Sequence, residues 1–156
     1  MNEIRVSALV LLHPVEPALL MVRKQGTTSF MLPGGKPEPG EGAEETIIRE
    51  IAEELGLDLE PSRLSPLGTF AADAANEVDH RVIGDVFSYE GLPADLDVER
   101  IQIAAEIAEA GWFPYAPMPS DTAERQFAPL TRDQVVPAMI ENGLLSRHCG
   151  GMTVRE

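Results

Sequence analysis

The hydrophobic positions near the N-terminus form two continuous runs rather than an alternating pattern. Residues 4–12 and 18–24 are aliphatic and β-branched, and the turn signal HPVEP lies between them. Runs of this kind predict strands, and we expect these two strands to pair. Residues 27–35 indicate a loop followed by a short extended piece that ends at the Pro33-Gly34-Gly35 turn.

Residues 43–55 have the periodicity of an amphipathic helix. With about 100° between successive residues, the apolar side chains fall within an arc of roughly 140°. These side chains are Ile47, Ile48, Ile51, Ala52 and Leu55. Gly56 follows at the position where a left-handed residue commonly ends a helix. The pattern therefore predicts one helix with a single face toward the core.

The C-terminal half of the chain returns to strands. Residues 62–73 and 80–91 predict two of them, separated by a polar turn. Residues 92–115 predict a loop with a short helix, ending in a strand at residues 110–115. Strands that surround a few helices, with one helix placed between consecutive strands, indicate an α/β (α+β) fold with a mixed sheet.

The last helical pattern covers residues 130–145 and begins near Thr131, with Pro137 as a kink or an early stop. A chain of 156 residues with 44% apolar content is sufficient for one core. We therefore expect a single domain over residues 1–145 and a flexible tail over residues 146–156.

The charge balance excludes several classes of partner. Twelve basic side chains against 26 acidic ones give a formal charge of -14, which argues against binding to a nucleic acid polymer or to an anionic membrane. Cys149 is the only cysteine, so an intrachain disulfide is excluded and a reducing compartment is indicated. The N-terminus has no apolar run long enough for a signal sequence or a membrane span. We expect a soluble, cytoplasmic protein.

Three glutamates of the predicted helix form a cluster. Glu50, Glu53 and Glu54 fall within an arc of about 100°, which we expect to lie away from the apolar face. Like charges at spacings of three and four residues destabilise a helix by roughly 0.2–0.5 kcal/mol per pair. A hard divalent cation such as Mg²⁺ would relieve this repulsion. A merely solvated acidic face fits the spacing equally well.

The turn before this helix has the properties of a ligand site. Gly34 and Gly35 allow a tight turn with no Cβ to obstruct an approaching group. Lys36 supplies a positive charge that would suit a phosphate, although a plain surface lysine is the alternative interpretation. Gly34 and Lys36 are therefore candidate substrate-binding residues.

Together these residues resemble the Nudix hydrolase family, whose pattern is G-x5-E-x7-R-E-U-x-E-E-x-G-U, where U is a bulky aliphatic residue. The matching positions are Gly35, Glu41, Arg49, Glu50, Ile51, Glu53, Glu54, Gly56 and Leu57. A chance match at a given start is on the order of one in a billion from average residue usage. The resemblance implies a mixed β-sheet sandwiched between helices. It also implies hydrolysis of a nucleoside diphosphate linked to another group, by attack of water on phosphorus.

The resemblance assigns a role to each residue of the motif. Glu53 and Glu54 are the main expected ligands of a Mg²⁺ ion, for which Mn²⁺ could substitute, and the Gly35 carbonyl is a further ligand. Glu50 is either another ligand or the base that deprotonates the attacking water. Arg49 and Glu41 are expected to hold the loop against the helix.

Residues outside the motif are assigned more loosely. Family members often complete the site with an acid from the loop before a strand that contains a tryptophan. Glu106 is the first candidate, six residues before Trp112, and Glu109 is the second. Arg23 is a candidate for phosphate binding, or else a surface charge. Three phenylalanines could stack on a base or belong to the core: Phe30, Phe70 and Phe87.

The substrate is predicted only as a class. Some subfamilies that act on ADP-ribose carry a proline after the motif, and some that act on diadenosine polyphosphates carry a tyrosine there. Residues 69–76 of this chain contain neither. A (deoxy)nucleoside triphosphate or an oxidised nucleotide is the first expectation. ADP-ribose, nucleotide sugars and dinucleotide polyphosphates are the alternatives, and a non-catalytic nucleotide-binding module is the alternative of another class. Small members of the family often dimerise, so a homodimer is a further expectation.

Overall fold

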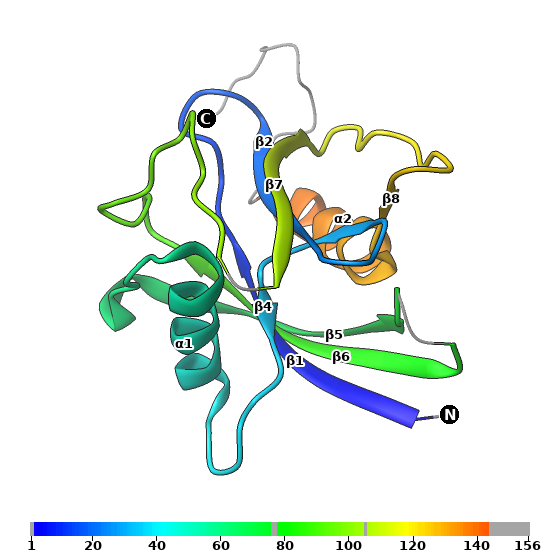
Figure 1. Cartoon of the computed structure of the whole chain (residues 1–156), viewed down its shortest axis with the longest axis horizontal. Helices are drawn as coiled ribbons and strands as arrows, with labels where there is room; N and C mark the ends of the chain where they lie inside the picture. The colour runs from blue at the N-terminus through cyan, green and yellow to red at the C-terminus, as the bar shows by residue number, and fades with distance from the viewer. Residues whose placement is uncertain (1, 76–77, 105, 144–156) are drawn as a thin grey trace.

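The computed structural model describes residues 2–75, 78–104 and 106–143 (Figure 1). Its elements, in chain order, are β1 (Asn2–Val10), β2 (Ala18–Lys24), β3 (Ser29–Met31), β4 (Gly34–Gly35), α1 (Ala43–Leu55), the short 3₁₀ helix η1 (Pro61–Arg63), β5 (Leu64–Asp73), β6 (His80–Tyr89), β7 (Ile107–Pro114), β8 (Gln126–Phe127), the π-helical segment η2 (Leu130–Val135) and α2 (Val136–Glu141). The predictions made for the C-terminal tail, residues 146–156, which include Cys149, lie outside the described residues.

The strands form two mixed sheets, with the orders β4-β1-β6-β5 and β7-β2-β3-β8. β1 runs parallel to β6 and antiparallel to β4, whereas β2 is antiparallel to both β3 and β7. The two sheets meet where β1 leads into β2: a bridge joins Leu12 to Leu19, and the Leu20 N–H donates to the Leu11 carbonyl at 3.0 Å. The predicted pairing of the first two strands is therefore limited to their adjacent ends.

Residues 7–10 of β1 and 18–22 of β2 are buried on both faces, which explains their continuous apolar sequences. One face packs against α1 and the other against η2 and α2, so that the sheets lie between helices (Figure 1). The side chains toward α1 include Leu9, Leu11, Leu20 and Val22, and those toward η2 and α2 include Val10, Leu19 and Met21. The predicted α/β (α+β) sandwich of a mixed sheet between helices is confirmed.

α1 has the predicted boundaries, and each of its ends is closed by a local hydrogen bond. At the N-terminus the Gly42 N–H donates to Glu45 Oε1 at 2.9 Å. At the C-terminus Gly56 takes φ 68°, and its N–H donates to the Ala52 carbonyl at 3.0 Å. Ile47 and Ile51 are fully buried on the inner face.

Two segments differ from the sequence prediction. Residues 90–104 contain bends and turns rather than a short helix, and β7 starts at Ile107, earlier than expected. The Trp112 Nε1–H donates to the Val98 carbonyl at 2.8 Å, which ties the irregular segment to β7. This contact joins residues 14 positions apart, so a local pattern does not reveal it.

The last helix continues through Pro137 instead of stopping there. The Val136 N–H donates to the Thr131 carbonyl, an i→i+5 bond, before the α-helical turns of α2 begin. Pro137 lies in the first turn of α2, where a missing N–H removes no helical bond. Among the described residues, the helices are too short and too polar to cross a membrane.

Candidate active site

The Gly34-Gly35 turn lies directly against the carboxylates of α1. The Gly34 N–H donates to Glu54 Oε1 at 3.3 Å. Gly34 has φ 153°, and a Cβ there would lie 1.9 Å from the Ser7 carbonyl oxygen. A Cβ on Gly35 would lie 2.4 Å from Cδ of Glu50. Only glycine permits this approach, so the turn and the helix form one unit.

Arg49 joins the preceding loop to α1. Its Nε and Nη2 donate to the two carboxylate oxygens of Glu41 at 2.6 and 2.9 Å, and Nη2 also donates to the Lys36 carbonyl at 2.9 Å. Its Nη1 donates to Glu50 at 3.0 Å and to Glu53 at 3.3 Å. The guanidinium therefore fixes the loop and orients two of the predicted site carboxylates at once.

These contacts change the acidity of Glu41. Hydrogen bonds from the Arg49 guanidinium, and then from the Glu38 N–H, lower the pKa of Glu41 from 4.5 to about 2. The same pairing with Glu41 raises the pKa of Arg49. Glu41 and Arg49 are thus both charged near neutral pH, so the ion pair between them is maintained.

Glu54 is buried, with only 2% of its surface exposed. Burial is the main reason that the pKa of Glu54 rises to about 8; the neighbouring Glu50 adds to the rise, while Lys24 and the Gly34 N–H oppose it. The expectation that all three glutamates lie away from the apolar face is therefore wrong for Glu54. On a helical wheel it lies only about 20° from Ile47, at the border of the buried face.

Glu53 has the opposite environment. Its side chain is 53% exposed, and its nearest charged partner is Arg49. Within the described ranges, no three His, Cys, Asp or Glu side chains gather closely enough to hold a metal ion as they stand. The structure brings Glu50 and Glu54 together, and it directs Glu53 to Arg49.

The donor set nevertheless fits a divalent cation. Glu50 and Glu54 are adjacent acids, one of them buried, and two such carboxylates need a proton or a cation between them. Carboxylate oxygens are the ligands that Mg²⁺ prefers. Glu53 lies one residue from Glu54 on the same helix, and turning it toward the pair would cost one solvent-exposed ion pair.

The residues proposed from β2 and β7 are arranged differently from one another. Arg23 pairs with Glu109 across the strands at 3.2 Å and also donates to the Thr27 carbonyl at 2.7 Å. Glu106 precedes β7, is 68% exposed, and lies 4.0 Å from the Lys24 ammonium.

Lys24 was not among the residues expected from the sequence. The signal that places it is the alternation of β2, which puts Lys24 on the face of Leu20 and Val22, toward α1.

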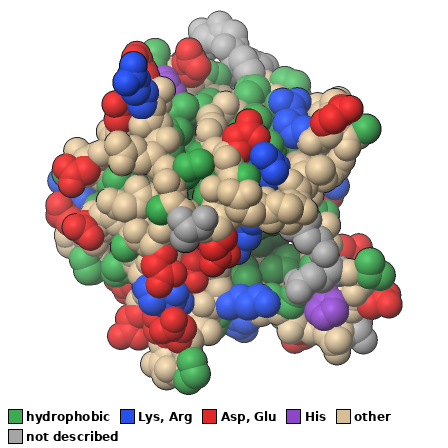
Figure 2. Space-filling view, in the orientation of Figure 1, with side chains coloured by type: hydrophobic (Ala, Val, Ile, Leu, Met, Phe, Trp, Pro, Cys, Tyr) green, Lys and Arg blue, Asp and Glu red, His purple; other side chains and the backbone are tan. Residues whose placement is uncertain are grey.

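A cavity of about 340 Å³ is lined in part by the Gly34-Gly35 turn. Lys24 and Lys36 line it beside the glycines, and Ile4, Val6 and Leu130 are among its apolar walls. Figure 2 shows charged side chains crowded over α1 and its preceding loop, beside a hollow with apolar lining. The turn therefore contacts Glu50 and Glu54 of α1 and also lines a pocket of ligand size.

The phenylalanines do not line this cavity. Phe30 and Phe87 are buried in the two core clusters, and Phe70 packs against one of them. The core interpretation therefore fits Phe30 and Phe87, and the walls of the cavity are mainly aliphatic.

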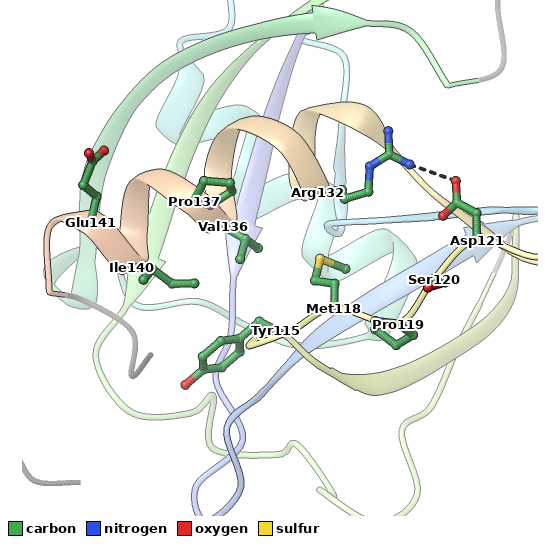
Figure 3. A pocket seen from close by; sticks show the side chains of 10 residues that line it. All are labelled: Tyr115, Met118, Pro119, Ser120, Asp121, Arg132, Val136, Pro137, Ile140 and Glu141. Atoms are coloured by element: carbon green, nitrogen blue, oxygen red, sulfur yellow. Dashed lines mark hydrogen bonds and ion pairs between the residues drawn. The ribbon is translucent and has the colours of Figure 1, made fainter. Parts of the chain in front are cut away.

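A larger open groove of about 870 Å³ lies between α2 and residues 115–121 (Figure 3). Met118, Val136 and Ile140 point into it, and Arg132 pairs with Asp121 at 2.8 Å along its edge. No residue of the matched motif lines this groove. We therefore assign the candidate site to the smaller cavity.

Two curated relatives match parts of the chain. A Mycobacterium tuberculosis protein, provisionally named mutator protein MutT4, is 34% identical over 129 residues, which are 78% of this chain and 48% of the relative. A Bacillus subtilis protein, provisionally named an 8-oxo-dGTP diphosphatase, is 32% identical over 68 residues, 44% of each chain. The matches thus span less than half the length of each relative.

Solved structures share the fold. The MutT protein from Methanosarcina mazei Go1 has a TM-score of 0.68 at 19% identity, covering 91% of this chain and 96% of that one. A bifunctional NMN adenylyltransferase/ADP ribose pyrophosphatase from Francisella tularensis, complexed with AMP and a Mn ion, has a TM-score of 0.60 at 19% identity, covering 91% and 42%. The model of the NUDIX domain matches residues 2–134. The chain therefore belongs to the Nudix family, whose members generally depend on a divalent metal and act on small-molecule nucleotides.

Proposed function

We propose that the chain is a Mg²⁺-dependent hydrolase that cleaves a pyrophosphate bond in a (deoxy)nucleoside triphosphate or an oxidised nucleotide. The observation that carries this proposal is the Gly34-Gly35 turn, which contacts the buried Glu54 and Glu50 and also lines the cavity. A phosphate chain leaving the cavity would pass directly by the carboxylates. The name of the Bacillus subtilis relative supports the same substrate class.

The metal would be held by Glu50 and Glu54, joined by Glu53, the Gly35 carbonyl and, from the edge of β7, Glu106. When bound, it would neutralise charge on the phosphoryl oxygens and lower the pKa of the attacking water. Mn²⁺ would serve as a substitute. Glu50 either ligates the metal or accepts the proton of the water.

Arg49 and Glu41 act as positioning residues. The bidentate contact between them holds the loop against α1, and Arg49 Nη1 aims the Glu50 carboxylate. Loss of this orientation would displace the acid that faces the turn. Orientation of the reacting groups supplies a large part of catalysis in phosphoryl transfer.

The cavity would hold the base and the sugar. At about 340 Å³ it lies at the small end of the range for ligand pockets, which suits one nucleoside better than two. Gly34 and Lys36, which line it, would meet the phosphates. Arg23 would have to leave Glu109 to do so.

A product analysis tests the proposal. The protein is incubated with nucleoside triphosphates, 8-oxo-dGTP, ADP-ribose, a nucleotide sugar and a dinucleotide polyphosphate, with Mg²⁺ or with EDTA. We expect a nucleoside monophosphate and pyrophosphate from a triphosphate, only with Mg²⁺. Turnover that persists in EDTA would contradict the mechanism. Binding without turnover of any compound would instead indicate a non-catalytic nucleotide-binding module.

Two further expectations belong to this proposal. We propose a cytoplasmic location, where the nucleotide substrates are found, and a homodimer as the working assembly. Fractionation of cells and light scattering of the purified chain would test them separately.

A further inference from the structure

The sequence contains two lysines, Lys24 and Lys36, and both line the candidate cavity. They come from different elements, since Lys24 ends β2 and Lys36 follows β4. Gly34 and Gly35 line the same cavity. None of the eight arginines in the described part of the chain lines it. A lysine is a compact charge on a flexible stem, which suits a mobile phosphate chain better than the fixed fork of an arginine.

Lys24 also faces two of the proposed metal-site acids. Its ammonium lies 4.0 Å from Glu106 Oε1, and its charge is the main influence opposing the effect of burial on Glu54. The neighbouring Arg23 has a different role, because it is paired with Glu109 on β7. Lys24 thus lies beside Glu106 and also lines the cavity.

The end of β2 lies opposite an irregularity in β7. The partner of Arg23 on β7 is Glu109, whereas the partner of Lys24 is Ile107, so β7 contributes one extra residue, Ala108, between them. Such bulges are common beside active sites. The shift brings the end of β2 close to Glu106, whose carbonyl accepts the Gln25 N–H at 2.8 Å.

We propose that Lys24 is a substrate-binding residue: its ammonium balances Glu54 and Glu106 in the metal-free site, and it binds the phosphate chain, together with Lys36, when the substrate enters. The inference rests on the proposed function. The Lys24 charge should affect the affinities for the two ligands in opposite directions, because it repels a divalent cation and attracts a polyphosphate.

The test compares Lys24→Met, which keeps the length of the stem and removes the charge, with Lys24→Arg, which keeps the charge. The matched control is Arg63→Met, because Arg63 ends η1, does not line the cavity and pairs with Glu60. Titration calorimetry measures the affinity for Mn²⁺ alone and, in EDTA, for dGTP and inorganic triphosphate. Thermal unfolding checks that each variant is folded.

We expect Lys24→Met to bind Mn²⁺ several-fold more tightly and both polyphosphates about tenfold more weakly, from the typical effect of one charged hydrogen bond. Lys24→Arg should restore most of the polyphosphate affinity, and Arg63→Met should match the wild type. Unchanged affinities in Lys24→Met, or a loss for both kinds of ligand, would overturn the inference while the proposed function stands. A wild-type protein that binds neither Mn²⁺ nor polyphosphate would overturn the proposed function itself.

Discussion

Two adjacent glutamates of one motif occupy opposite environments. Glu54 is buried against the Gly34 N–H, whereas Glu53 is half exposed beside Arg49. A buried acid costs more free energy than a buried amide of the same shape. Glu54 is therefore retained at some expense in stability, as is common for functional groups.

We predict that Glu54→Gln lowers turnover by at least about 100-fold, because loss even of a group that only orients a metal ligand costs roughly 10–100-fold. Its melting temperature should equal or exceed that of the wild type, since an amide replaces a buried acid. Glu53→Gln should also lose activity, with little change in stability. Turnover assays and thermal unfolding measure the two effects. Near-normal activity in either variant would contradict the ligand assignment.

Gly35 allows a direct test of the contact between the turn and Glu50. An alanine Cβ would lie 2.4 Å from the Glu50 Cδ, so the carboxylate must move. We expect Gly35→Ala to lose at least about tenfold in activity, the lower bound for disturbing an oriented group, while the protein stays folded. The control is Gly111→Ala, whose Cβ would meet the Phe113 ring at an ordinary 3.6 Å. Full activity in Gly35→Ala would show that the position of Glu50 is not critical.

The loop before α1 is held by an ion pair whose strength depends on pH. The pKa of Glu41 is lowered from 4.5 to about 2, chiefly by the hydrogen bonds from Arg49. A lowered pKa in the folded state means that the pair stabilises the fold above about pH 4.5. This stabilisation is lost as the pH falls from there toward 2.

We therefore predict that Glu41→Gln melts at a lower temperature than the wild type at pH 7, and that the difference shrinks as the pH falls below 4.5. Melting curves between pH 7 and pH 2.5 provide the measurement. Glu44→Gln, which changes an exposed acid of the first helical turn, is the control. A difference for Glu41→Gln that is independent of pH would mean that the Arg49 pair does not stabilise the fold.

How well an element can be predicted from the sequence depends on where its contacts lie. α1 is predicted to its observed ends because its apolar spacing and Gly56 are local signals. Residues 90–104 are not, since they are ordered by distant contacts, such as the Ala104 N–H donating to the Glu54 carbonyl. The motif likewise identifies Glu41 and Arg49, but the place of Lys24 depends on the register of β2 with β7.

At the scale of the whole molecule, the charge of -14 and the site make separate contributions to stability. Repulsion among the acids destabilises the compact state, and any salt reduces it by screening. A bound metal stabilises only the state that contains the site, by about 2.7 kcal/mol at 100 times its dissociation constant. Screening and binding can therefore be distinguished by comparing salts at equal ionic strength.

We predict that NaCl raises the melting temperature modestly and that MgCl₂ at equal ionic strength raises it further. With about 2–4 °C per kcal/mol for a domain of this size, saturating Mg²⁺ should add roughly 5–10 °C. In Glu54→Gln the response to MgCl₂ should fall toward the response to NaCl, because the buried ligand is lost while screening is almost unchanged. Equal responses of the wild type to the two salts would mean that these acids bind no Mg²⁺ and that their repulsion is relieved by screening alone.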